Sequence, residues 1–139
     1  MTTQRWLTRG ERGQSITAFA VVMMSALIMT AGLVIDGGQK VAAASRAEVA
    51  ASGASRAAGN AAATKELAGT DSAGAAVIAA RKYLAGQPDV QGSVSVTAGI
   101  VSVRTRAEEP TFFLSMIGID RVIGTGAAQA NIVATGETR

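Results

Sequence analysis

The longest apolar stretch of the chain lies near its N-terminus. No charged residue occurs between residues 13 and 35, and residues 16–35 form a run of 20 mostly apolar residues that ends at Asp36. As a helix, this run spans about 30 Å, the thickness of the hydrocarbon core of a bilayer. Nine of its residues are Leu, Ile, Val or Phe, which favours insertion by about 3–5 kcal/mol. The pattern predicts one transmembrane helix over residues 15–36.

Beyond this run the sequence becomes alanine-rich and contains no proline until residue 88. Alanine is the best helix former, so we expect one helix from about residue 15 to about residue 63, with a bend near Gly37-Gly38. Small residues recur at spacings of three and four and define an alanine stripe: Ala43, Ala47, Ala50, Ala54 and Ala58. Such a stripe lets another backbone approach closely. Both a neighbouring subunit and the chain's own globular part fit, and we expect both at different heights.

A second helix is expected over residues 73–85, after a polar break. Asp71 or Ser72 can cap its N-terminus. The pattern then switches to a period of two, which predicts a strand over residues 90–96 and another over residues 100–106. Ala98-Gly99 between them is typical of a hairpin turn.

The last part of the chain is expected to hold a short helix and one more strand. Glu108-Glu109-Pro110 is expected to break the second strand as a solvated turn. A short helix follows over residues 111–117, ended by Gly118, and a last strand is expected over residues 122–134.

These elements predict a membrane-anchored α+β fold, in an arrangement that resembles the pilin architecture. A long N-terminal transmembrane helix continues outside the membrane and is followed by a small head with a short helix and a three-stranded antiparallel sheet. The expected parts are a cytoplasmic basic leader, the transmembrane helix, an alanine-rich extension and an extracytoplasmic head, at residues 1–14, 15–36, 37–68 and 69–139.

The charge distribution predicts the orientation. Arg5, Arg9 and Arg12 precede the apolar run with the single acid Glu11, whereas ten basic and nine acidic residues follow it. The positive-inside rule therefore places the N-terminus in the cytoplasm and the head outside. The head offers neither a basic face nor stacking aromatic residues, so no nucleic-acid partner is expected.

A cleaved secretory signal peptide is the main alternative for the N-terminal segment. Its apolar region would be about 7–15 residues long and followed at once by small residues at a cleavage site. Here the apolar run is longer, and the small residues at positions 41–44 lie well past its end. A membrane anchor is the preferred interpretation.

The residue types argue against enzyme chemistry. The chain has no cysteine and no histidine, which removes thiol nucleophiles, imidazole acid–base groups and the usual zinc ligands. Glu108 and Glu109 are neighbours in an extended segment and point to opposite faces. No Gly-Lys-Ser/Thr sequence follows the glycines, so no phosphate-binding loop is expected. We expect no catalytic residues, cofactor or metal site.

Several motifs resemble one family when taken in their order along the chain. Arg12-Gly13-Gln14-Ser15 precedes the apolar run, residues 31–38 read Ala-Gly-Leu-Val-Ile-Asp-Gly-Gly, and an alanine-rich continuation carries Arg46 and Arg56. With Phe112-Phe113-Leu114 and Gly126-Ala-Ala-Gln-Ala130 near the end, the chain resembles the TadE/TadG-like minor pilins of the tight-adherence machinery, which builds Flp-type (type IVb) pili.

The resemblance implies processing by a prepilin peptidase after Gly13, which would leave Gln14 as the new N-terminus. One position departs from the pilin pattern, because Ala18 stands where pilins carry a glutamate at the fifth mature residue. That glutamate meets the N-terminal amine of a neighbouring subunit in the apolar core of the filament. Its absence favours a minor or priming subunit, or an uncleaved component of the secretion apparatus, over a major filament subunit.

The resemblance also implies the function and the partners. We expect a pseudopilin of the bacterial inner membrane that acts in pilus assembly, protein secretion or cell adhesion through helix–helix association. Its expected partners are the membrane, other pilin-like subunits, the Tad assembly-platform proteins and a prepilin peptidase. The alternative function is a single-pass, membrane-tethered binding module whose head recognises an extracytoplasmic ligand.

Overall fold

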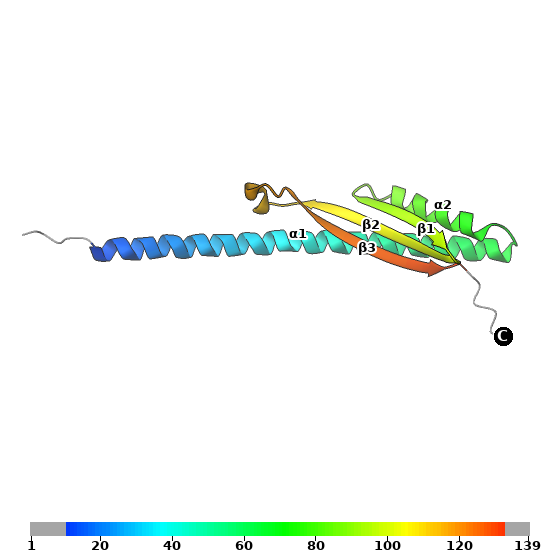
Figure 1. Cartoon of the computed structure of the whole chain (residues 1–139), viewed down its shortest axis with the longest axis horizontal. Coiled ribbons are helices and arrows are strands. Elements are labelled where there is room, and N and C mark those ends of the chain that lie inside the picture. Colours follow the sequence, from blue (N-terminus) through cyan, green and yellow to red (C-terminus); the bar gives the residue numbers. More distant parts are fainter. Residues whose placement is uncertain (1–10, 133–139) are drawn as a thin grey trace, which may run out of the picture.

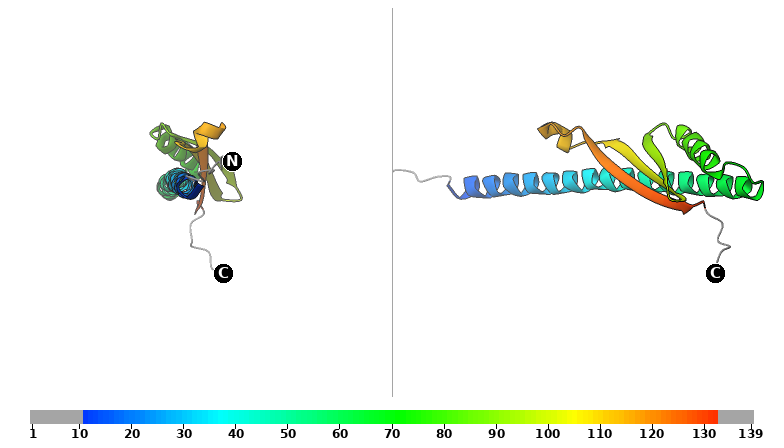
Figure 2. Two further views of the ribbon diagram at one scale, coloured as in Figure 1. Left: turned by 90° about the vertical axis from the view of Figure 1, so that its left-hand side faces the viewer. Right: turned by 45° about the vertical axis from the view of Figure 1, so that its right-hand side comes forward.

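The computed structural model describes residues 11–132, with side chains from residue 15 onward. Its longest element is α1 (Glu11–Leu67), a single helix of 57 residues, which corresponds to about 85 Å. The helix is longer at both ends than the sequence predicted. Figures 1 and 2 show a straight helix, without the bend that was expected near Gly37-Gly38.

The N-terminal part of α1 stands clear of the rest of the molecule (Figure 1). Residues 15–31 are all exposed, and only 6% of the most apolar 18-residue window of the helix is buried. By length and composition, α1 is long and apolar enough to cross a membrane. The core helix of a soluble protein would instead be largely buried.

The head consists of the helix α2 (Ser72–Ala85) and a sheet of three strands, β1 (Val90–Thr97), β2 (Ile100–Pro110) and β3 (Arg121–Asn131). The sheet is antiparallel with the order β1-β2-β3. A 3-10 turn, η1 (Leu114–Ile117), lies between β2 and β3. Figure 2 shows the head gathered on one side of α1. The predicted long helix, second helix and three-stranded sheet are confirmed.

Local chemistry explains where these elements begin and end. Asp71 caps α2, with its Oδ1 accepting a hydrogen bond of 2.9 Å from the Gly74 N–H. Ala98 and Gly99, the hairpin residues, both have positive φ, as a tight two-residue turn between twisted strands requires. Gly118 ends η1 in the left-handed region. All three features were expected from the sequence.

The core between the head and α1 is built of small residues. Alanines of α1 and α2 form its helical side, and Val101 and Val103 of β2 are fully buried against them. Gly124 and Gly126 let β3 lie almost in contact with the helix backbone: a Cβ on Gly124 would come within 2.1 Å of the Ala44 nitrogen. Small side chains bury little area each, so close approach supplies much of the packing.

Two expectations about the second half of the head are wrong. The segment Glu108-Glu109-Pro110 does not break the strand; it forms the end of β2 and pairs with the first residues of β3. Pro110 is tolerated because β2 has outrun β1 at this point, where the pairing between them ends at Ala107, so the strand is paired on one side only, as an edge strand is. The predicted short helix is reduced to the four residues of η1. Residues 133 and 134 of the predicted last strand lie outside the described residues.

Candidate functional site at the base of the head

The carboxylate of Asp36 joins α1 to the segment between β2 and β3. The N–H of Phe112 donates to Oδ1 at 2.8 Å, and the N–H groups of Phe113 and Leu114 donate to Oδ2 at 3.0 and 2.6 Å. Asp36 is only 1% exposed. Hydrogen bonds to a carboxylate are about twice as strong as neutral ones, so this side chain holds the segment firmly against the helix.

In the sequence Asp36 marks only the end of the apolar run, and the structure adds a tertiary role for its side chain. The helix continues past Asp36 to Leu67, and the side chain turns toward the head. It accepts hydrogen bonds from residues 76 to 78 positions later in the chain. The charge at the end of the apolar run therefore makes a tertiary contact with the segment after β2.

Gly32 provides the second contact at this junction. A Cβ built on Gly32 would lie 2.4 Å from Cγ of Phe113 and 2.9 Å from its Cβ. The ring of Phe113 therefore rests directly on the helix backbone, one turn before Asp36. The two contacts place the segment after β2 beside the last residues of the apolar run.

Two further contacts hold the sheet to α1, nearer to the C-terminal end of the helix than Asp36. Nη1 of Arg46 lies 2.5 Å from Oε1 of Glu109, and the Glu109 side chain is 10% exposed. The hydroxyl of Thr105 donates a buried hydrogen bond of 2.6 Å to the carbonyl oxygen of Ala47. Glu108, on the opposite face, is partly exposed and pairs with Arg106 and Arg121. The two glutamates thus lie on opposite faces, as expected, but Glu109 is not solvated.

The alanine stripe of α1 lies against the chain's own head. Ala50 is 3% exposed, and the other members, Ala43, Ala47, Ala54 and Ala58, are fully buried. Of the two alternatives that the sequence left open, packing on the globular part is the one present here. A neighbouring helix reaches these residues only if the head is displaced, and their expected use as a surface between subunits stays a prediction.

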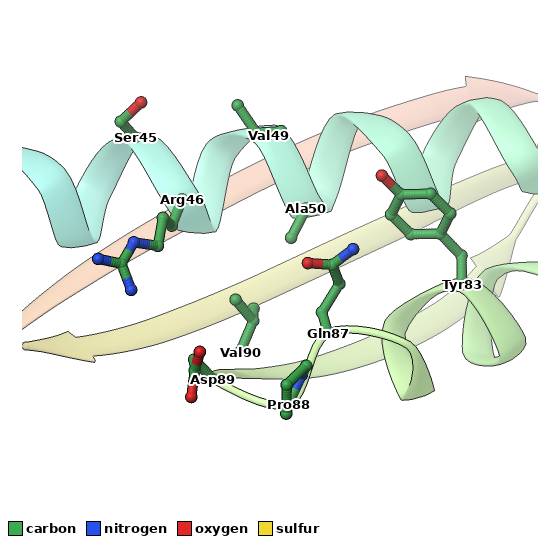
Figure 3. A pocket seen from close by; sticks show the side chains of 9 residues that line it. All are labelled: Ser45, Arg46, Val49, Ala50, Tyr83, Gln87, Pro88, Asp89 and Val90. Atoms are coloured by element: carbon green, nitrogen blue, oxygen red, sulfur yellow. The ribbon is translucent and has the colours of Figure 1, made fainter.

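The head has a shallow groove between α1 and the α2–β1 connection (Figure 3). Its volume is about 200 Å³, below the roughly 300–1,000 Å³ of typical ligand sites. Figure 3 shows Arg46, Tyr83 and Asp89 at its edges, and Arg46 is engaged by Glu109. The groove has no converging set of groups suited to catalysis.

The described residues contain no group of three or more potential metal-ligating side chains of Asp or Glu. At the proposed cleavage site, the backbone of Gly13 and Gln14 belongs to α1, while their side chains lie outside the described residues. Ala18 is exposed on α1.

Sequence reasoning missed the contacts of Gly32 and Thr105 and the tertiary role of Asp36. A signal for the close approach of β3 was present, because glycines at alternate positions of a strand indicate that another backbone lies near. The partners of Asp36 carried no such signal, since they are backbone amides.

Comparison of the chain with known protein families, curated proteins and solved structures finds no match.

Proposed function

We propose that the chain is a membrane-anchored pilin-like subunit that acts structurally, as a TadE/TadG-like minor pilin of a tight-adherence pilus or secretion machinery. The observation that carries this proposal is the single helix α1. Its N-terminal part, residues 15–35, is apolar and largely exposed, and we call it the bare part of α1; the C-terminal part carries the head. The order of motifs around Gly13, Asp36 and Phe112 supports the family.

The bare part of α1 supports membrane anchoring. Twelve large apolar side chains between residues 16 and 35 are 46–74% exposed. So large a continuous apolar surface is not stable in water and marks contact with lipid or with other apolar helices. Both surroundings occur for a pilin-like subunit, which lies in the membrane before it joins its neighbours.

The junction at Asp36 favours an assembly subunit over a tethered binding module. A tethered module needs only a linker between anchor and head, and a flexible linker widens its reach. Here α1 continues without interruption from the apolar run into the head, and Asp36 and Gly32 lock the head to it. Such a rigid subunit keeps its head at one height and rotation, as regular side-by-side packing requires.

Crosslinking between subunits tests the proposal. The chain contains no cysteine, so single cysteines introduced one at a time from residue 22 to residue 35 each give a unique reactive site. Gly32 is left unchanged, because Phe113 fills the space beside it. With full-length protein in its native membrane, we expect disulfide-linked dimers whose yield rises and falls with the helical period of about 3.6 residues. Ser95→Cys, on an exposed position of β1, is the control. Uniformly low yields would favour the tethered module.

A further inference from the structure

The segment between β2 and β3 exposes large apolar side chains. Phe112 is 60% exposed, Met116 83%, Ile117 73% and Ile119 47%. The sheet and α2 turn most of their apolar side chains inward. Four large apolar side chains within eight residues thus form an exposed cluster, which we call the apolar loop, residues 112–119.

The apolar loop lies at the height where the apolar run of α1 ends. Phe113 rests on Gly32 and the Asp36 carboxylate holds the loop backbone. Gly32 is three residues before Ile35, or about 5 Å along the helix axis. In Figure 1 the loop forms the end of the head that faces the bare part of α1. A bilayer around the apolar run would therefore meet this loop at its surface.

Most backbone N–H groups of the loop are hydrogen-bonded within the protein. Six of its N–H groups donate to acceptors within the protein, and so does that of the preceding Thr111: the six are those of Phe112, Phe113, Leu114, Met116, Gly118 and Ile119. The hydroxyls of Thr111 and Ser115 donate to loop carbonyls. Donors that are already paired within the protein lower the cost of moving the loop from bulk water to the membrane boundary.

We propose that the apolar loop inserts into the outer boundary of the same bilayer that α1 crosses, and so forms a second membrane contact of the head. Amphipathic helices at a membrane surface bury their apolar face about 5–10 Å into the boundary between headgroups and acyl chains, and we expect a similar depth for the apolar loop. Asp120 and Arg121 follow the loop at once and are exposed, which suits the headgroup level. The proposal rests on the membrane anchoring proposed above.

Tryptophan fluorescence tests this contact in the full chain. Trp6 is the only tryptophan, so a Trp6→Phe background allows one reporter at a time. Met116→Trp and Ile117→Trp report on the loop, and Leu27→Trp reports on the membrane span. Ile78→Trp reports on the far part of the head, since Ile78 lies on α2 and is 69% exposed. Each variant is reconstituted at low density into phosphatidylcholine/phosphatidylglycerol vesicles, with bromine placed near the headgroup end or the tail end of the acyl chains.

The proposal predicts blue-shifted emission from both loop reporters, quenched more strongly by shallow than by deep bromine. Leu27→Trp should show the reverse preference, and Ile78→Trp should be unquenched. Loop reporters as unquenched as Ile78→Trp, beside a quenched Leu27→Trp, would overturn the loop contact and leave the anchor intact. Blue-shifted but unquenched emission from the loop reporters would show that the loop packs against protein, and this result would also overturn the membrane contact of the loop. An unquenched Leu27→Trp would remove the anchor, and the loop contact with it.

Discussion

The ring of Phe113 occupies the space that a side chain at position 32 would fill. A Cβ on Gly32 would come within 2.4 Å of the ring, so the junction between the apolar run and the head requires glycine at this point of the helix. Gly37 lies in the same helix, with nothing within 4 Å of the corresponding Cβ position. The two glycines therefore predict opposite results for the same substitution.

We expect Gly32→Ala to displace the segment around Phe113 and to speed hydrogen exchange of the amides of residues 112–114. The added methyl group overlaps the base of the ring, so movement of the ring tip does not relieve the clash. Exchange measured by mass spectrometry on the full chain in micelles checks this. Gly37→Ala is the matched control and should stabilise the helix by about 0.5–1 kcal/mol. Equal exchange in both variants would show that the Phe113 contact does not hold the loop.

Asp36→Asn should loosen the same segment without a steric change. The amide has one acceptor oxygen and no charge, so the three N–H groups from Phe112 to Leu114 lose their common anionic partner. We expect exchange of these amides to become about tenfold faster or more. Asp120→Asn, at an exposed position beyond the loop, should leave it unchanged. Unaltered protection in Asp36→Asn would contradict the role assigned to this carboxylate.

Gly126→Ala should push β3 away from α1. The new Cβ would lie 2.5 Å from the carbonyl carbon and oxygen of Ala47, and backbone atoms of a long helix cannot move aside. We expect a loss of about 2–3 kcal/mol in the free energy of unfolding, as for other overpacked sites. Thr125→Ala changes the exposed neighbour and should stay within about 0.5 kcal/mol. Thermal unfolding followed by circular dichroism compares the two variants, and similar stabilities would refute the close packing.

The Arg46–Glu109 pair should respond unequally to removal of either partner. The Arg46 side chain is 51% exposed and that of Glu109 only 10%. Arg46→Gln therefore leaves a largely buried carboxylate without its cation. We expect the free energy of unfolding to fall by about 1–2 kcal/mol, less than for a fully buried pair because solvent screens the charges. Glu109→Gln frees an arginine that already reaches water and should destabilise less. Denaturant titration of both single variants and the double variant checks the order. A reversed order would contradict the burial of Glu109.

The sequence predicted the elements of the fold because each has a local signal. The apolar run, the alanine-rich extension, the Asp71 cap and the Ala98-Gly99 turn are all read within a few neighbouring residues. The junction lacked such a signal. Asp36 and Phe112 are 76 positions apart, and nothing in an apolar run followed by an acid tells where the carboxylate points.

Glu109 was misread for a related reason. A Glu-Glu-Pro sequence is typical of a solvated turn, yet pairing with β3 extends the strand through it, and Arg46 on the helix neutralises the inward glutamate. The alanine stripe was ambiguous for a similar reason, because small residues indicate close packing but do not identify the element that packs against them. Here the partner is the chain's own sheet.

The measurement that tests the central proposal most directly is the intact mass and N-terminal sequence of the protein isolated from its native membrane. The proposed pilin-like subunit predicts a membrane-bound chain that begins at Gln14, retains residues 16–35 and carries the head on the same helix. A soluble chain that begins beyond Ile35 would show that the apolar run is a signal peptide, and it would contradict both the anchor and the pilin-like subunit.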